Sequence, residues 1–214
     1  FQTKKVSFKL LASDGKTELD GKASVRSDAW MDFGDTGRTG GTMELLPTNY
    51  TFKVEYLGAS QQRIQNVGEN PNVVFQTAKV SFNLLSSLGL PLKGDASFYS
   101  DGWHPFGKGK TGETIELLPV NYLFKAEYGG ASIQKSQTIE PGIKNVVSFK
   151  TKLVLVNMYT KVKVLGLTVK VPLIGGKVSY YAGGEWKEMG KAPELKEMLP
   201  TSYMFALEFM GQRQ

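Results

Sequence analysis

Three tryptophans are the residues of this sequence whose type and spacing most directly suggest binding chemistry. They are the only tryptophans present, and each opens the same pattern, Trp-x-x-apolar-Gly, at Trp30, Trp103 and Trp186. An aromatic ring on an open face can stack on a sugar ring, so the three indoles are candidate contacts for a polysaccharide ligand. Because Trp is usually highly buried, packing between sheets is the alternative interpretation.

Two sets of acidic residues also recur. They are Glu44, Glu116 and Glu197, and Glu55, Glu127 and Glu208. Paired carboxylates can act as acid and base in catalysis, but these residues repeat along the whole chain within regular strands, whereas an active site occurs once and on loops. We therefore expect solvated strand faces that pair across strands with lysines such as Lys53 and Lys125, no catalytic residue and no enzyme.

The sequence contains no convincing metal or cofactor motif. His104 is the only histidine, cysteine is absent, and the aspartates of the N-terminal third lack the spacing of a calcium loop. No nucleotide-binding, dinucleotide-binding or nucleophile-elbow motif is present. We expect no metal and no cofactor.

Positive charge is concentrated towards the C-terminus of a chain whose net charge is +6, and no acidic residue lies between Lys150 and Gly184. Two alternating runs around Leu165-Gly166 predict an inserted hairpin there. Its lysines, Lys161, Lys163 and Lys170, are candidate contacts for an anionic surface, such as a cell-wall polymer or an acidic subunit. The alternative is a charged edge that discourages aggregation of strands. We expect neither a nucleic-acid partner nor membrane insertion.

The candidate residues recur because the chain is a tandem repeat. A Glu-x-Leu-Pro stretch starts at Glu44, Glu116 and Glu197, and an aromatic-alternating run follows each one. In the first run Tyr50 and Phe52 would share one face of a half-buried strand, with Lys53 on the other. About seven such short strands per repeat predict an all-β fold of β-sandwiches.

The predicted domains are three repeats, residues 1–74, 75–148 and 149–214, called repeats 1, 2 and 3 below. No Gly or Pro interrupts the stretch from Asn72 to Leu85, which joins repeat 1 to repeat 2. A continuous strand shared by neighbours leaves little room for a hinge. The sequence therefore predicts a stiff rod of three units.

The turn Thr-Gly-x-x-Gly, the Leu-Leu-Pro strand and the Tyr-x-Phe-x-Val run together resemble the transthyretin-like β-sandwiches. This group includes carboxypeptidase regulatory-type domains and the B-type repeats of bacterial collagen adhesins. The resemblance covers all three repeats and implies immunoglobulin-like or prealbumin-like sandwiches in an extracellular or cell-surface protein.

The adhesin repeats often contain an isopeptide bond between a lysine and an asparagine beside a buried acid. Lys5 and Lys79 recur before the first strand of a repeat, and Asn72 and Asn145 recur near the last strand. The recurrent acids of the aromatic-alternating runs, however, fall on the face opposite the aromatics, and Leu153 replaces the lysine in repeat 3.

The ends of the sequence also follow the repeat. Phe1-Gln2-Thr3 matches Phe75-Gln76-Thr77, and the sequence stops at Gln214, before counterparts of the last two strands. We expect repeat 3 to be C-terminally incomplete and to be completed by further sequence or by a strand of a neighbouring subunit.

The leading hypothesis for function is a structural stalk, fibre or surface-layer segment of a large extracellular protein, which could polymerise head to tail. The alternative is a carbohydrate-binding or adhesive module that uses the recurrent tryptophans.

Overall fold

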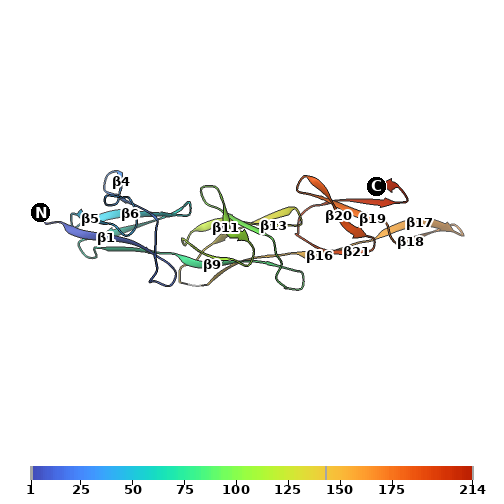
Figure 1. Ribbon diagram of the computed structural model, residues 1–214, viewed down its shortest axis with the longest axis horizontal. Coiled ribbons are helices and arrows are strands. Elements are labelled where there is room, and N and C mark those ends of the chain that lie inside the picture. The colour runs from blue at the N-terminus through green and yellow to red at the C-terminus, as the bar shows by residue number, and fades with distance from the viewer. Residues whose placement is uncertain (1, 143, 214) are drawn as a thin grey trace. The chain divides into compact units, whose positions relative to one another are not determined.

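The computed structural model describes residues 2–142 and 144–213, and the regular structure in this part of the chain consists of strands (Figure 1). In the same part, no helix is long and apolar enough to span a membrane. The chain divides into two compact units. Unit 1 comprises Phe1–Phe82, Ala96–Phe124 and Lys135–Val147, and unit 2 comprises Asn83–Asp95, Lys125–Gln134 and Ser148–Gln214.

Unit 1 begins with the strands of repeat 1. These are β1 (Lys4–Leu11), β2 (Glu18–Leu19), β3 (Lys22–Arg26), β4 (Trp30–Asp32), β5 (Thr42–Leu45), β6 (Asn49–Tyr56), β7 (Ala59–Asn66) and β8 (Asn72–Gln76). One sheet has the order β2-β1-β5, with β8 also pairing with β1, and the other has the order β4-β3-β6-β7. The β1–β8 pair is parallel, whereas β1 pairs with β2 and β5 in antiparallel fashion.

Aromatic side chains from both sheets form the core of this part of unit 1. The alternation of β1 buries Val6, Phe8 and Leu10 completely. The ring of Phe8 lies 5.3 Å from that of Phe33 and 5.5 Å from that of Phe75, measured between centroids. Phe75 belongs to β8, so the strand that leads into repeat 2 also fills the core of repeat 1.

The strands of repeat 2 are β9 (Ala78–Leu85), β10 (Asp95–Tyr99), β11 (Trp103–Lys110), β12 (Thr114–Leu117), β13 (Asn121–Tyr128), β14 (Ala131–Thr138) and β15 (Asn145–Lys150). They form one sheet of order β11-β10-β13-β14 and one of order β12-β9-β15. Strands β11 and β12 lie in unit 1, and the other five have residues in both units. The predicted continuous stretch from Asn72 to Leu85 is two strands, β8 and β9, separated by Thr77 alone.

Unit 2 contains the strands of repeat 3. These are β16 (Lys152–Val156), β17 (Met158–Val164), β18 (Leu167–Leu173), β19 (Lys177–Ala182), β20 (Glu185–Lys191), β21 (Glu194–Met198), β22 (Met204–Phe209) and β23 (Gln212–Arg213). The sheet order β20-β19-β22-β23 repeats the order of the sheets β4-β3-β6-β7 and β11-β10-β13-β14. The other sheets of unit 2 are the pairs β16-β21 and β17-β18.

The core of repeat 3 contains fewer aromatic side chains than the core of repeat 1. Met189 stands where the repeat places Phe33, and the buried cluster around it is built from Met158, Val178, Tyr180, Ala182, Ala192 and Met198. Phe205, the counterpart of the fully buried Phe52, is 38% exposed. Among the described residues, no strand adds to β16 as β8 adds to β1, so a counterpart of Phe75 does not cover this face. The same alternation therefore buries Phe205 less than it buries Phe52.

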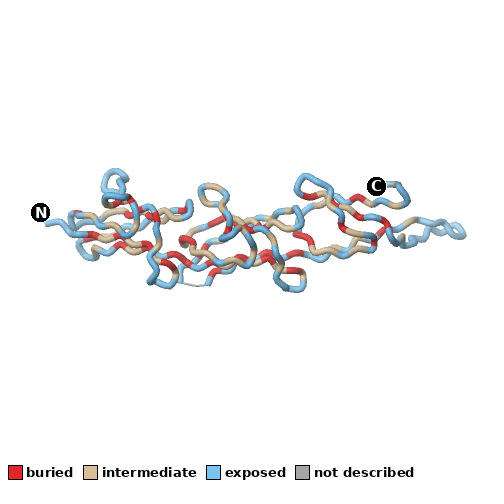
Figure 2. Tube along the Cα trace, viewed as in Figure 1, coloured by how far each residue is buried: buried red, intermediate tan, exposed pale blue. Residues whose placement is uncertain are grey.

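The hairpin predicted around Leu165-Gly166 is formed by β17 and β18, which pair from Met158↔Leu173 to Val164↔Leu167. Leu165 and Gly166 both have positive φ, 49° and 82°, as a two-residue hairpin turn requires. The hairpin extends beyond the other strands of unit 2 (Figure 1), and β18 is exposed over nearly all its length (Figure 2).

Phe52 and Phe205 provide a matched test of this difference in packing. Phe52→Ala should lower the free energy of unfolding of its sheet by about 3–5 kcal/mol, because a fully buried ring leaves a cavity. Phe205→Ala should cost only about 1–2 kcal/mol, since much of its ring already contacts water. Urea unfolding followed by hydrogen exchange in β6 and β22 measures both losses. Equal losses would contradict the conclusion that Phe52 is packed more deeply than Phe205.

Candidate functional sites: carboxylate clasps and a tryptophan face

In unit 1, the recurrent glutamate of β12 joins three separate segments of the chain. Ser13, in the turn after β1, donates its backbone N–H to Glu116 Oε2 (3.0 Å) and its hydroxyl to Oε1 (2.6 Å). Thr77, between β8 and β9, donates its hydroxyl to Glu116 Oε2 (2.6 Å). We call this set of Ser, Thr and Glu a carboxylate clasp.

Unit 2 contains a second clasp built from the same residue types. Ser87, in the turn after β9, donates its N–H to both carboxylate oxygens of Glu197, at 3.1 Å each, and its hydroxyl to Oε1. Thr151, between β15 and β16, donates its hydroxyl to Oε2. Each clasp therefore binds a turn of one repeat to the first sheet of the next.

The threonine of each clasp is deeply buried and has its polar groups satisfied. Thr77 and Thr151 are 2% and 1% exposed. Their backbone N–H groups donate to the carbonyl oxygens of Leu11 and Leu85, both at 2.9 Å. A buried hydroxyl without a partner would be costly, so the position needs an acceptor of the kind that the glutamate supplies.

The electrostatics of the clasp in unit 2 favour an ionised carboxylate. Hydrogen bonds from Ser87 and Thr151 lower the pKa of Glu197, and nearby Lys150 adds to this shift. In unit 1, burial raises the pKa of Tyr56, and the negative charge of Glu116 raises it further. A carboxylate that accepts hydrogen bonds from two separate segments of the chain can hold those segments together.

A second contact accompanies each clasp. In unit 1, Ser100 Oγ, between β10 and β11, donates to the carbonyl of Leu57 (2.8 Å), in the β6–β7 turn. In unit 2, the hydroxyl of Tyr180 donates to the carbonyl of Gly129 (3.0 Å), in the β13–β14 turn. Gly58 and Gly130 lie in these turns with positive φ, and a Cβ atom there would force the side chains of Asp101 and Lys187, 2.1 and 2.3 Å away from it, to move.

The clasps are the part of the structure that sequence reasoning missed. Lys53 and Lys125 do pair with acids, but not across strands as expected: their partners are Glu55 and Glu127, along the same strands and at 2.5 Å in both cases. Glu116 and Glu197 instead accept hydrogen bonds from residues far away in the sequence. The recurrence of Ser13 as Ser87 and of Thr77 as Thr151 was the available signal.

The residues named for an isopeptide bond do not have the required surroundings. Lys5 and Lys79 are exposed on β1 and β9, where they lie opposite Glu44 and Glu116 in the strand register. Asn145 is buried but exchanges hydrogen bonds with the backbone of Glu140, at 3.0 and 2.9 Å.

The recurrent tryptophans lie on the second sheet of each repeat. Trp30, Trp103 and Trp186 are 37%, 43% and 44% exposed, so their indoles are not part of a core. Lys53 Nζ lies 5.1 Å from the ring centroid of Trp30, and the guanidinium of Arg213 lies 4.8 Å from that of Trp186. Trp103 packs edge-on against Tyr99 at 5.6 Å.

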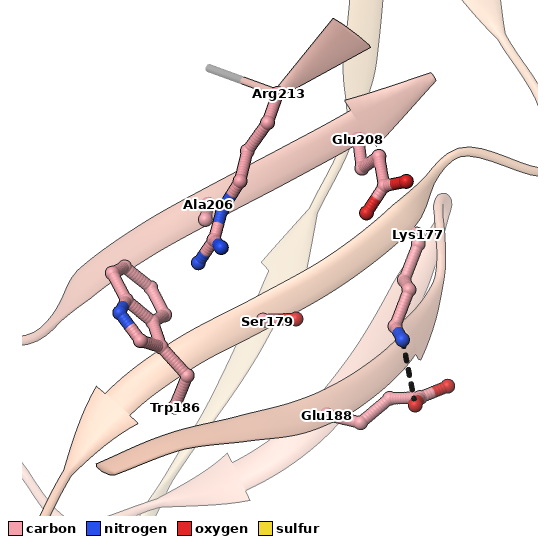
Figure 3. A pocket seen from close by; sticks show the side chains of 7 residues that line it. All are labelled: Lys177, Ser179, Trp186, Glu188, Ala206, Glu208 and Arg213. Atoms are coloured by element: carbon pink, nitrogen blue, oxygen red, sulfur yellow. Dashed lines mark ion pairs between the residues drawn. The ribbon is translucent and has the colours of Figure 1, made fainter. Parts of the chain in front are cut away.

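A hollow of about 270 Å³ lies beside Trp186 in unit 2 (Figure 3). It is lined by Lys177, Ser179, Trp186, Glu188, Ala206, Glu208 and Arg213. The hollow therefore combines one aromatic ring, two carboxylates and two cations on the exposed face of a sheet.

The three lysines predicted to contact an anionic surface lie on the hairpin. Lys161 and Lys170 are directly opposite each other in the register, and Lys163 follows on the same face of β17. All three are exposed. Like charges directly opposite are unfavourable, so this lysine strip would be stabilised by an anion.

His104 is paired with Asp101 (2.6 Å). Within residues 2–142 and 144–213, no group of three or more His, Asp or Glu side chains could hold a metal ion.

Comparison with known proteins adds little. No protein-family model matches the chain, and no curated protein matches it. Among solved structures, it is similar to the Bacillus anthracis TIE protein (TM-score 0.30, 15% identity, covering 98% of this chain and 46% of that one). It is also similar to a streptococcal ancillary pilin (TM-score 0.32, 11% identity, covering 96% and 89%). At these TM-scores the likeness extends to all-β character and no further.

The pKa of Glu197 tests the clasp directly. Thr151→Val removes one hydrogen bond to the carboxylate, so the pKa of Glu197 should rise towards its ordinary value of 4.5. The titration of the Glu197 side-chain carbonyl carbon by NMR measures the change, and Thr201→Val, at an exposed position, is the control.

The same shift gives a dependence of stability on pH. Because the folded-state pKa lies below the unfolded value, the clasp stabilises unit 2 fully above the unfolded pKa and loses this contribution as the pH falls through the folded one. Acid should therefore destabilise unit 2 less in Thr151→Val than in the wild type. An identical acid response in the two proteins would argue against the clasp.

Proposed function

We propose that the chain is a structural segment of an extracellular stalk, fibre or surface layer. It would be built from three tandem immunoglobulin-like or prealbumin-like β-sandwiches with the boundaries 1–74, 75–148 and 149–214. One sheet order, found in β4-β3-β6-β7, β11-β10-β13-β14 and β20-β19-β22-β23, recurs in all three repeats and supports this proposal. Its task would be mechanical, to hold successive repeats in a fixed arrangement, and it would need no catalytic residue.

The observation that carries the proposal is that the two clasps are equivalent. Both junctions use a buried threonine between two strands, a serine in a turn and the glutamate of the Glu-x-Leu-Pro stretch. A flexible linker would need none of these hydrogen bonds. The presence of the same hydrogen bonds at both junctions is expected of a chain whose junctions resist bending.

The proposal extends to longer assemblies. Glu44 is the counterpart of Glu116 and Glu197 in the repeat, and it is exposed on β5. A serine-bearing turn of a further repeat, or of another subunit placed head to tail, could dock there by the same hydrogen bonds. Neighbouring repeats and identical subunits are thus the partners we propose.

A second candidate function is adhesion through the tryptophan face. The observation that favours it is the exposure of all three indoles, between 37% and 44%. The cations over Trp30 and Trp186 support the alternative, in which each indole and its cation form a packed surface pair.

We also propose that the lysine strip contacts an anionic cell-wall polymer or an acidic subunit. The direct opposition of Lys161 and Lys170 supports this contact. Protection of an exposed hairpin from pairing with other strands explains the same lysines without a partner.

Spin labels can test the mechanical proposal, because the chain has no cysteine of its own. Labels at Asp28→Cys and Lys108→Cys, both in unit 1, should give one narrow distance distribution. Inserting Gly-Gly-Ser after Thr77 breaks the clasp geometry and should broaden that distribution while each sheet stays folded. The same insertion after Gly89, in an exposed turn of unit 2, is the control. A wild-type distribution as broad as that of the Thr77 insertion would defeat the proposal.

Binding to polyphosphate as a function of salt tests the lysine strip. Replacing Lys161, Lys163 and Lys170 with Gln should weaken binding and flatten its salt dependence, since exposed charges act through screened attraction. Replacing three exposed lysines elsewhere, Lys16, Lys108 and Lys144, controls for net charge. An equal effect of the two triple variants would mean that the strip has no special role.

A further inference from the structure

Repeat 3 differs from the other repeats at one position beside its tryptophan. In the strand register, Lys53 lies opposite Ser24, and Ala206 lies opposite the equivalent Ser179. The repeat also has a lysine, Lys125, at this position in its second copy. Only repeat 3 replaces the lysine with alanine.

The exchange removes the side chain that covers this face in repeat 1. The side chain of Lys53 is only 22% exposed and runs beside Trp30 to pair with Glu55. Ala206 has no atoms beyond Cβ, so the corresponding space is the hollow of about 270 Å³ beside Trp186.

The groups around the hollow point into it from three sides (Figure 3). Trp186 stands on one side, and Lys177 and Glu188, which form an ion pair (3.2 Å), stand on the other. Arg213 reaches over the indole from β23, and Ser179 lies on the floor. The cation is thus still present over the tryptophan, but it comes from the rim rather than from the floor.

We propose that the hollow beside Trp186 binds one ring of a neutral polysaccharide. The half-exposed indole offers an apolar surface to the C–H face of a sugar. The carboxylates of Glu188 and Glu208 can accept hydrogen bonds from hydroxyl groups, and Lys177 and Arg213 can donate to them. Alternating donors and acceptors around an aromatic ring suit a ligand that has hydroxyl groups on its edge and no charge.

The balance of charge selects a neutral ligand. Lys177 and Arg213 carry two positive charges, and Glu188 and Glu208 carry two negative charges, so the hollow is close to neutral as a whole. An anionic ring would meet two carboxylates, and a cationic one would meet an ammonium and a guanidinium. This inference rests on the second candidate function, adhesion through the tryptophan face, and narrows it to one of the three indoles.

NMR of the full chain can read the three indoles separately, because each gives its own N–H signal, assigned by Trp→Phe variants. The probes are three neutral oligosaccharides: cellohexaose, maltohexaose and chitohexaose. At least one should shift the Trp186 signal saturably, with a dissociation constant on the order of 1 mM, and leave Trp30 and Trp103 in place.

Ala206→Lys is the decisive variant, since it restores the lysine that the other repeats carry and should weaken binding at least tenfold. Thr201→Lys adds the same charge at an exposed position of unit 2 and should bind as the wild type does. Glu188→Gln keeps the size of the side chain but removes an acceptor charge and should weaken binding severalfold.

The outcomes separate the two ideas. Unchanged binding in Ala206→Lys would overturn the inference. Shifts at Trp30 or Trp103 but not at Trp186 would overturn it while leaving adhesion through the tryptophan face in place. If none of the three sugars moves any indole signal, the inference about Trp186 and adhesion through the tryptophan face are both wrong. The mechanical proposal, which the spin labels test, is unaffected by that result.

Discussion

The crossing from one repeat to the next is the constraint on which the rest of this structure depends. Strand β8 completes the first sheet of repeat 1 by pairing in parallel with β1, and after a single residue the chain continues as β9 of repeat 2. Thr77 is therefore buried where two sheets meet, and each of its polar groups must find a partner away from water. The N–H group finds the carbonyl of Leu11, and the hydroxyl finds Glu116.

This constraint explains why a charged residue recurs within an otherwise regular strand. A carboxylate has enough acceptor capacity to serve a hydroxyl from the crossing and both donors of a serine in the preceding repeat. The hydrogen bonds from the serine and the threonine also favour the ionised form, as the lowered pKa of Glu197 indicates. Local strand structure and assembly of the array are thus linked through one side chain per junction.

Repeat 3 shows what happens when parts of the pattern are absent. Where β8 contributes Phe75 to the first core, the described part of repeat 3 has no equivalent strand on β16, and Phe205 becomes partly exposed. The inserted β17–β18 hairpin contributes to the core only at its base, where Met158 is buried and Leu173 packs against the core cluster. Further along the hairpin the aliphatic residues, including Val169 at 46%, are exposed. The exchange of Lys53 for Ala206 similarly opens the tryptophan face, so the repeat with fewer buried aromatics than repeat 1 also has the hollow beside Trp186.

The sequence by itself determined the all-β character, the strand positions and the hairpin at Leu165-Gly166, because period-two alternation and turn residues act over a few neighbours. It also identified the residues that recur, including Trp30, Glu116 and Lys53. Only the tertiary structure decided what these residues contact. Whether Trp30 is buried, and whether Glu116 meets a lysine or Ser13 and Thr77, depends on which distant strands lie side by side, and alternation within one strand contains no information about that. The hollow beside Trp186 was hidden for the same reason: Ala206 is an ordinary strand residue until the register places it opposite Ser179, in the space that a lysine fills in repeat 1.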